Sequence, residues 1–122
     1  MINITFSLLL LITGVLSNET VDNDAALYLA ACTVQNRIDS GWSYDTVLNH
    51  YYAPYSEPTK DQINIVKRVL LDNSKCPNVY FVYSEQDFNS LFNEDTKYMY
   101  KICKNNYCNI FMSKSQFRKS LK

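Results

Sequence analysis

The sequence predicts an α+β fold, a mainly helical single domain over residues 1–122 with a small antiparallel β-sheet. Three observations lead to this prediction. The N-terminal half carries long stretches in which apolar and small residues recur at helical spacing. Beyond residue 78, short runs of β-branched and aromatic residues are bounded by polar turn residues, as in strands. The length of 122 residues suits one hydrophobic core, and no linker or repeat divides the chain.

The apolar run over residues 8–16 predicts a first helix over residues 6–17. The same run also fits the hydrophobic core of a secretory signal, with Gly14 and Ser17 near a cleavage point. Residues 1–3 lack the Lys or Arg that signals normally carry, so we expect residues 1–17 to be a retained helix rather than a cleaved signal peptide. The run is too short to cross a bilayer, and no stable membrane span is expected.

A second helix is expected over residues 23–38, where Leu27, Ala31, Val34 and Ile38 share one face. Asp22 and Asn23 precede this helix as caps, and Gly41 can take the left-handed conformation that ends it. Near its end, Arg37 is expected to anchor a carbonyl or a carboxylate. Ser43 then caps a short helix that runs through residue 49.

An aromatic loop with two prolines follows at residues 51–58. It supplies Tyr51, Tyr52, Tyr55 and Ser56, which could bind a sugar. Exposed aromatic rings stack on the apolar face of a pyranose, and neighbouring hydroxyls bond its rim. The equally weighted alternative is a loop whose tyrosines cover the core.

The rest of the chain alternates between short helices and strands. Residues 58–72 predict a helix capped by Thr59, and residues 79–83 predict a strand. Ser84 caps a short helix through residue 92, and Ser113 opens a basic terminal helix. Between them, residues 97–102 and 107–112 predict two strands joined at Asn105-Asn106.

The formal net charge of zero argues against a protein that mainly binds nucleic acid. Charge is nonetheless uneven, because every charged residue after Asp95 is basic. This basic end could hold an anionic polymer such as a wall glycan or teichoic acid, and the alternative is a solvated terminal helix.

The chain has four cysteines and one histidine, which limits the disulfides and metal sites it can form. Cys103 and Cys108 flank a turn-like stretch, so they can face each other across a hairpin and form a disulfide in an oxidising compartment. Cys32 is interpreted as a small buried residue of the second helix. His50 is the only histidine and only one close cysteine pair exists, so no metal site and no cofactor are expected.

Glu19 is the candidate catalytic residue. It stands at the break between the first two helices, where partial desolvation should raise the pKa of a carboxyl and let it hold a proton as a general acid. The alternative for a Glu at a helix end is a solvated capping residue.

The surroundings of Glu19 resemble a known family. Residues 11–19 read Leu-Ile-Thr-Gly-Val-Leu-Ser-Asn-Glu, and residues 30–37 read Ala-Ala-Cys-Thr-Val-Gln-Asn-Arg. This resembles the catalytic domain of the spore-cortex-lytic enzyme and cell-wall hydrolase family, which reads roughly Leu-Leu-Ala-x-Val-Val-x-x-Glu-Ala-x-Gly-Glu and then a small-residue helix ending in Asn-Arg. Weaker matches follow at 47–48, 55–56, 63–71, 79–84 and 109–111. Asp22 stands where a second Glu is usual, and Asn109 replaces a closing His.

The resemblance implies a lysozyme-like domain that cleaves the glycan strands of peptidoglycan, in the manner of a bacterial enzyme or a phage endolysin acting at the cell wall. In a lytic transglycosylase one Glu protonates the departing glycosidic oxygen and then, as a carboxylate, takes the proton of the substrate's C6 hydroxyl. Glu19 would take both roles. The expected substrate-binding residues are Asp22, Tyr51, Tyr52, Tyr55, Ser56 and Asn109.

Two further hypotheses belong to other classes of protein. The domain could be a non-catalytic glycan-binding or structural module of a virion or a secreted assembly, which the departures at Asp22 and Asn109 favour. It could also be a small disulfide-stabilised secreted protein, which would require a cleaved N-terminus.

Overall fold

The computed structural model describes residues 4–51, 53–72 and 74–121. In chain order its elements are α1 (Phe6–Glu19), α2 (Asp24–Asp39), α3 (Tyr44–Leu48), α4 (Lys60–Leu70), β1 (Phe81–Ser84), α5 (Glu85–Leu91), β2 (Tyr100–Lys104), β3 (Tyr107–Met112) and α6 (Lys114–Ser120). Helices therefore lead and a small sheet follows, which confirms the predicted α+β class.

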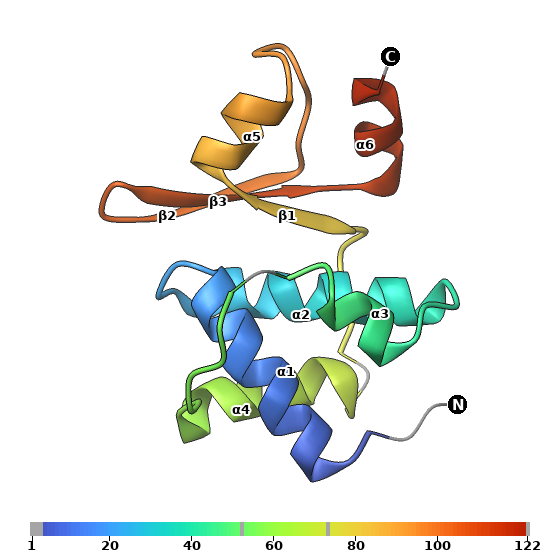
Figure 1. The fold of residues 1–122 in the computed structure, drawn as a ribbon, viewed down its shortest axis with the longest axis vertical. Coiled ribbons are helices and arrows are strands. Elements are labelled where there is room, and N and C mark those ends of the chain that lie inside the picture. The colour runs from blue at the N-terminus through green and yellow to red at the C-terminus, as the bar shows by residue number, and fades with distance from the viewer. Residues whose placement is uncertain (1–3, 52, 73, 122) are drawn as a thin grey trace.

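The elements form three layers (Figure 1). Helices α1–α4 make one layer, and α2 lies closest to the sheet. The sheet is antiparallel, in the order β1-β3-β2. Helices α5 and α6 cover its opposite face. Within the described residues, no helix is long and apolar enough to cross a membrane.

Helix boundaries follow the predicted caps closely. The side chains of Asn23, Ser43, Thr59, Ser84 and Ser113 each accept a backbone N–H in the first turn of α2, α3, α4, α5 and α6. The strands are less well placed: β1 begins two residues later than expected, and β2 occupies Tyr100–Lys104 rather than residues 97–102. Strand ends depend on pairing with β3, which local sequence does not specify.

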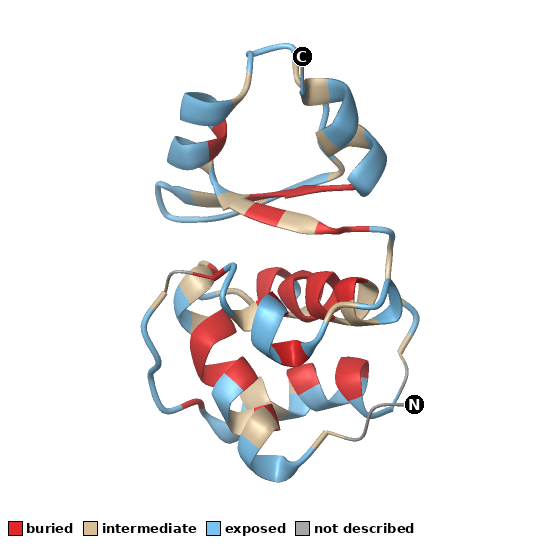
Figure 2. Cartoon of the chain, turned by 45° about the vertical axis from the view of Figure 1, so that its right-hand side comes forward, coloured by how far each residue is buried: buried red, intermediate tan, exposed pale blue. Residues whose placement is uncertain are grey.

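Helix α2 is the centre of the main core. The expected buried face is confirmed at Leu27, Ala31 and Val34, but burial extends almost all round the helix, as Figure 2 shows in red. The physical reason is that α2 packs against α1 and α4 on one side and the sheet on the other. Its small residues, Ala26, Ala30 and Ala31, allow this close approach from several directions.

From Asn109 onward, strand β3 is buried on both faces, because the helical layer covers one face and α5 and α6 cover the other. Phe111 belongs to the main core with the helical layer. Ile110 and Met112 belong to a second core, which Phe88 of α5 completes and Phe117 of α6 packs against. Side chains alternate along a strand, so Asn109 lies on the same face as Phe111, towards the helical layer.

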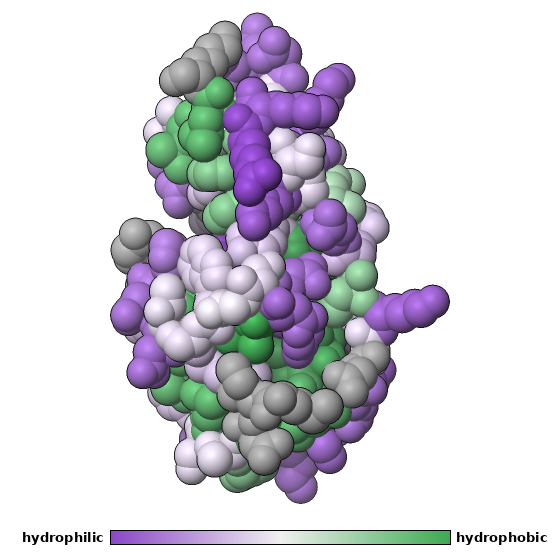
Figure 3. All heavy atoms as spheres, turned by 90° about the vertical axis from the view of Figure 1, so that its right-hand side faces the viewer, coloured by the Kyte–Doolittle hydropathy of each residue, from purple (hydrophilic) through white to green (hydrophobic). Residues whose placement is uncertain are grey.

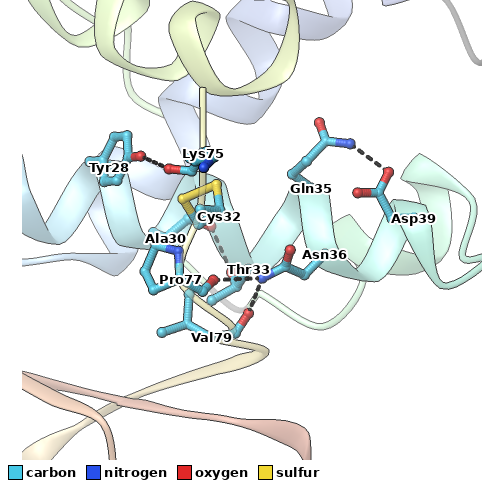
Figure 4. The surroundings of a disulfide bond; sticks show 11 residues. Tyr28, Ala30, Cys32, Thr33, Gln35, Asn36, Asp39, Lys75, Pro77 and Val79 are labelled. Atoms are coloured by element: carbon cyan, nitrogen blue, oxygen red, sulfur yellow. Dashed lines mark hydrogen bonds between the residues drawn. A yellow bond between two sulfur atoms is a disulfide. The ribbon is translucent and has the colours of Figure 1, made fainter. Parts of the chain in front are cut away.

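Two disulfides are present, and one was not expected. Cys103 pairs with Cys108 across the β2–β3 hairpin, with Cα atoms 4.0 Å apart, as predicted. Cys32 is fully buried in α2 as expected, but it also bonds Cys76, which precedes β1 (Figure 4). The two are separated by 44 positions, and no local spacing reveals such a pair.

The Cys32–Cys76 bond fixes the segment that leads from the helical layer to the sheet. Asn36 donates from Nδ2 to the carbonyls of Pro77 and Val79, at 3.1 and 2.6 Å, on the same side of α2 (Figure 4). The next residue, Arg37, donates from Nε to the carbonyl of Tyr80 at 2.8 Å, which confirms its predicted anchoring role. Seen from the side in Figure 3, hydrophilic side chains cover much of the sheet end of the molecule.

Candidate active site at the break between α1 and α2

Glu19 is the last residue of α1 and lies half-buried beside a cavity of about 500 Å³. One wall of the cavity is the α1–α2 connection and the other is the β2–β3 hairpin, which overhangs that connection in Figure 1. The lining residues are Glu19, Thr20, Val21, Asp22, Ser84, Lys104, Asn105, Tyr107, Cys108 and Asn109. The structure therefore brings together Glu19, Asp22 and Asn109 of the expected site.

The break at Glu19 is held by side-chain hydrogen bonds to the backbone at and just beyond the end of α1. The backbone of Thr20 takes an extended conformation, which ends the helix, and its hydroxyl donates to the carbonyl of Leu16 at 2.9 Å. From β3, Asn109 accepts the N–H of Val21 at 2.6 Å and donates from Nδ2 to the carbonyl of Glu19 at 3.3 Å. The sheet thereby fixes the backbone on which Glu19 stands.

The environment of Glu19 favours its protonated form. Burial raises the pKa of the carboxyl above its ordinary value, and the negative charge of Asp87 adds a smaller upward effect. The N–H of Ala53 donates to Oε2 at 3.2 Å and acts in the opposite direction, because it stabilises the carboxylate. Burial has the largest effect, so the net shift is upward. A raised pKa is what general-acid chemistry needs.

Asp22 has the opposite character. It is exposed, and Lys104 contacts it from the hairpin, with Nζ and Oδ2 2.8 Å apart. The hydrogen bond and positive charge of Lys104 lower the pKa of Asp22 below its ordinary value. Two carboxyl groups in one cavity thus have pKa values shifted in opposite directions, as in sites where one carboxyl acts as an acid and its neighbour stays ionised.

Asn109 was expected to bind substrate, from its place in the resemblance. In the structure, its amide is not free to do so. Only 3% of its surface is exposed, and both ends of the amide bond the backbone of residues 19–21. It lines the cavity as a residue that positions Glu19.

The described residues of the aromatic loop lie along α1 and do not line this cavity. Asn18 donates from Nδ2 to the carbonyl of Pro54 at 2.6 Å and to the hydroxyl of Ser56 at 2.7 Å. Gly14 allows the loop to approach, because a Cβ there would meet a ring atom of Tyr55 at 2.3 Å. The loop therefore supports α1 and, through Ala53, the carboxyl of Glu19.

The expectation that Tyr51 exposes a ring for sugar stacking is wrong. Tyr51 is 7% exposed, its hydroxyl and that of Thr33 are 2.6 Å apart, and the guanidinium of Arg37 lies over its ring. The alternative interpretation, a tyrosine that covers the core, holds at this position. Tyr55 is 49% exposed, as expected, and Tyr52 lies outside the described residues.

The hairpin supplies two cavity residues that the sequence did not single out, Lys104 and Tyr107. Tyr107 is 76% exposed, so its ring is available to a ligand. The turn at Asn105-Asn106 and its flanking cysteines were visible signals, and Asn105 takes the left-handed conformation that asparagine tolerates. What the sequence does not show is that this hairpin folds over Glu19.

Within the described part of the chain, no three His, Cys, Asp or Glu residues are grouped so that they could hold a metal ion. His50 is exposed, with its ring 5.0 Å from that of Trp42.

Comparison with known proteins adds no family to this description. No protein-family model, no curated protein and no solved structure matches the chain.

Proposed function

We propose that the protein cleaves the glycan strands of peptidoglycan as a lytic transglycosylase, with Glu19 as the single acid and base. The observation that carries the proposal is a half-buried carboxyl with a raised pKa, beside a cavity large enough for a sugar ring. The resemblance around residues 11–19 and 30–37 supplies the substrate class.

The proposed reaction needs one carboxyl group. Protonated Glu19 gives its proton to the glycosidic oxygen as the bond to the sugar's anomeric carbon breaks. The carboxylate left behind then takes the proton of the C6 hydroxyl of that sugar, whose oxygen bonds the anomeric carbon and closes a 1,6-anhydro ring. Glu19 ends protonated, and no water is consumed.

The character of Asp22 supports a one-carboxylate mechanism. Of the described residues that line the cavity, Asp22 is the only other carboxylate. It is exposed and paired with Lys104, which lowers its pKa and keeps it ionised. Hydrolysis by two carboxyl groups would need Asp22 to activate a water or attack the sugar, and its pairing with a cation weakens it as a base.

The test is Glu19→Gln, assayed on purified sacculi with the soluble products identified by mass spectrometry. Gln keeps the size of Glu and can still accept the N–H of Ala53, but it cannot donate a proton to the leaving oxygen. We expect wild type to release anhydro-muropeptides and the variant to lose about 10²- to 10⁴-fold of that activity.

Glu94→Gln is the matched control, because Glu94 is exposed and does not line the cavity. It should cleave like wild type. Products with reducing ends would indicate hydrolysis rather than transglycosylation. Equal cleavage by wild type and Glu19→Gln would show that Glu19 is not the acid. No cleavage by wild type would favour a non-catalytic glycan-binding module, for which the exposed ring of Tyr107 at the cavity is the supporting observation.

A further inference from the structure

The ion pair between Lys104 and Asp22 spans the cavity beside Glu19. Lys104 comes from the hairpin wall and Asp22 from the α1–α2 connection, and both residues line the cavity. Their side chains are 47% and 86% exposed, so the pair lies on the open side of the cavity, which we call the rim. A ligand that enters must pass or displace this contact.

From this placement we propose that Lys104 is a specificity residue that binds a carboxylate of the glycan, in exchange for Asp22. The inference rests on the proposed function and names the part of the substrate that the site selects, a muramic acid ring next to the bond to be cut whose lactyl carboxylate is free of stem peptide. Neutral glycans with the same backbone would lack this contact.

The exchange is physically inexpensive. Both partners are solvated, and an exposed ion pair contributes little to stability, so a substrate carboxylate can replace the carboxylate of Asp22 without leaving a buried charge. Tyr107 lies on the same wall, and its exposed ring can stack on the sugar that carries the acid. The Cys103–Cys108 disulfide ties the two strands directly beside Lys104 and Tyr107, which limits the motion of this wall.

Removing each partner of the ion pair in turn tests the inference, because the two changes should shift the affinity for acidic glycans in opposite directions. If Lys104 only holds the hairpin in place, removal of either partner should weaken binding of every glycan. If Lys104 selects acidic sugars, Lys104→Ala should lower affinity for them, whereas Asp22→Asn should raise it by freeing the ammonium group and removing a like charge.

Strand β2 supplies a matched control in Lys101. This lysine is 39% exposed, forms an ion pair with Glu85 and does not line the cavity. It lies three residues from Lys104 and therefore on the other face of the strand. Lys101→Ala removes the same charge from the same hairpin without changing the cavity.

The experiment measures binding by titration calorimetry in the Glu19→Gln background, which prevents turnover. One probe is a tetrasaccharide of N-acetylglucosamine, and the other alternates N-acetylglucosamine with N-acetylmuramic acid whose lactyl carboxylates are free. We expect the acidic probe to bind about threefold to fivefold more tightly at low salt, as one exposed ion pair allows. Lys104→Ala should abolish the preference, Asp22→Asn should increase it, and Lys101→Ala should leave it unchanged.

Equal affinity for the two probes, absence of binding to either, or a loss in Asp22→Asn as large as that in Lys104→Ala would overturn the inference. So would an equal effect of Lys101→Ala, which would indicate a diffuse charge effect. Its failure is distinguishable from failure of the proposed function. Preference for the acidic probe without release of anhydro products would contradict the proposed enzyme but support the carboxylate subsite. Cleavage of sacculi without that preference would support the enzyme but contradict the subsite.

Discussion

At the scale of single residues, Asn109 shows how the sheet controls the candidate catalytic group. Its amide satisfies the N–H of Val21 and the carbonyl of Glu19, and it is 3% exposed. We expect Asn109→Ala to lower the free energy of unfolding by about 1–3 kcal/mol, because it leaves a part-buried N–H and a part-buried carbonyl without this partner. The same variant should lower kcat more than it changes KM, since it loosens the backbone beneath Glu19. Urea unfolding and steady-state kinetics provide the two measurements.

The control for Asn109 is Asn89→Ala, a change on the exposed surface of α5 that should alter stability by no more than about 0.5 kcal/mol. An Asn109→Ala variant with unchanged stability would show that its two hydrogen bonds do not hold the break. A variant that loses stability but keeps wild-type kcat would leave Asn109 as a purely structural residue.

Arg37 is a second residue whose environment the sequence only partly revealed. Its anchoring of a carbonyl was predicted, but the rings that surround it were not. The guanidinium lies within 6 Å of the ring centroids of Trp42, Tyr51, Tyr80 and Phe81. Of these, Tyr80 and Phe81 come from a distant part of the chain. Local spacing predicts which residue caps or anchors, whereas the partners of a buried side chain depend on the complete packing.

At the scale of elements, the two disulfides should differ in what they contribute to stability. Cys32–Cys76 closes a long loop, with a sequence separation of 44, whereas Cys103–Cys108 has a separation of 5. The chain-entropy model gives about 4 kcal/mol for the first bond and about 2 kcal/mol for the second. We expect Cys32→Ala/Cys76→Ala to lower the free energy of unfolding by about twice as much as Cys103→Ala/Cys108→Ala, as measured by urea unfolding.

Equal losses of unfolding free energy in the two double variants, or a larger loss in the hairpin variant, would contradict this expectation. The hairpin variant offers a second measurement, because its strands line the cavity. It should weaken binding of the tetrasaccharide probes while most of the stability remains, whereas Cys32→Ala/Cys76→Ala should affect binding only where it unfolds the chain.

Elements differ in how far the sequence could predict them, and the difference has a physical cause. Helix caps are local, so Thr59, Ser84 and Ser113 were placed correctly from neighbouring residues alone. The β3 strand was placed at its true bounds because apolar residues fill both of its faces. Strand β2 was displaced, since its register is set by pairing with β3.

At the scale of the whole molecule, the candidate site lies where the helical layer meets the sheet. Glu19 was predictable because a local break between two helices marks it. The second wall was not, since the hairpin is more than 80 positions away along the chain and reaches Glu19 only through the fold. The same reason explains why neither the place of Tyr107 at the cavity nor the burial of Tyr51 was predicted. A tyrosine-rich segment is visible in sequence, but its orientation is not.

Burial of Glu19 should also link the stability of the whole protein to pH. Its pKa is raised on folding above the ordinary value of 4.5, so the folded state holds this proton more tightly than the unfolded state. The stabilising effect is complete at acidic pH and is lost as pH rises from about 4.5 through the higher folded pKa. Above that pKa, the folded protein keeps a half-buried carboxylate. Glu19→Gln removes this cost, so we expect the variant to be more stable than wild type at pH 7 and the difference to shrink towards pH 4.

Urea unfolding of wild type and Glu19→Gln at several pH values between 4 and 7 measures this difference directly, with Glu94→Gln as the exposed control. A difference that does not change with pH would assign the effect to packing rather than to ionisation. A variant that is less stable than wild type at pH 7 would show that the N–H of Ala53 stabilises the carboxylate more than burial penalises it. The expected result links site and fold, because the partial burial that raises the pKa of Glu19, as the proposed reaction requires, also makes the folded chain less stable when that proton leaves.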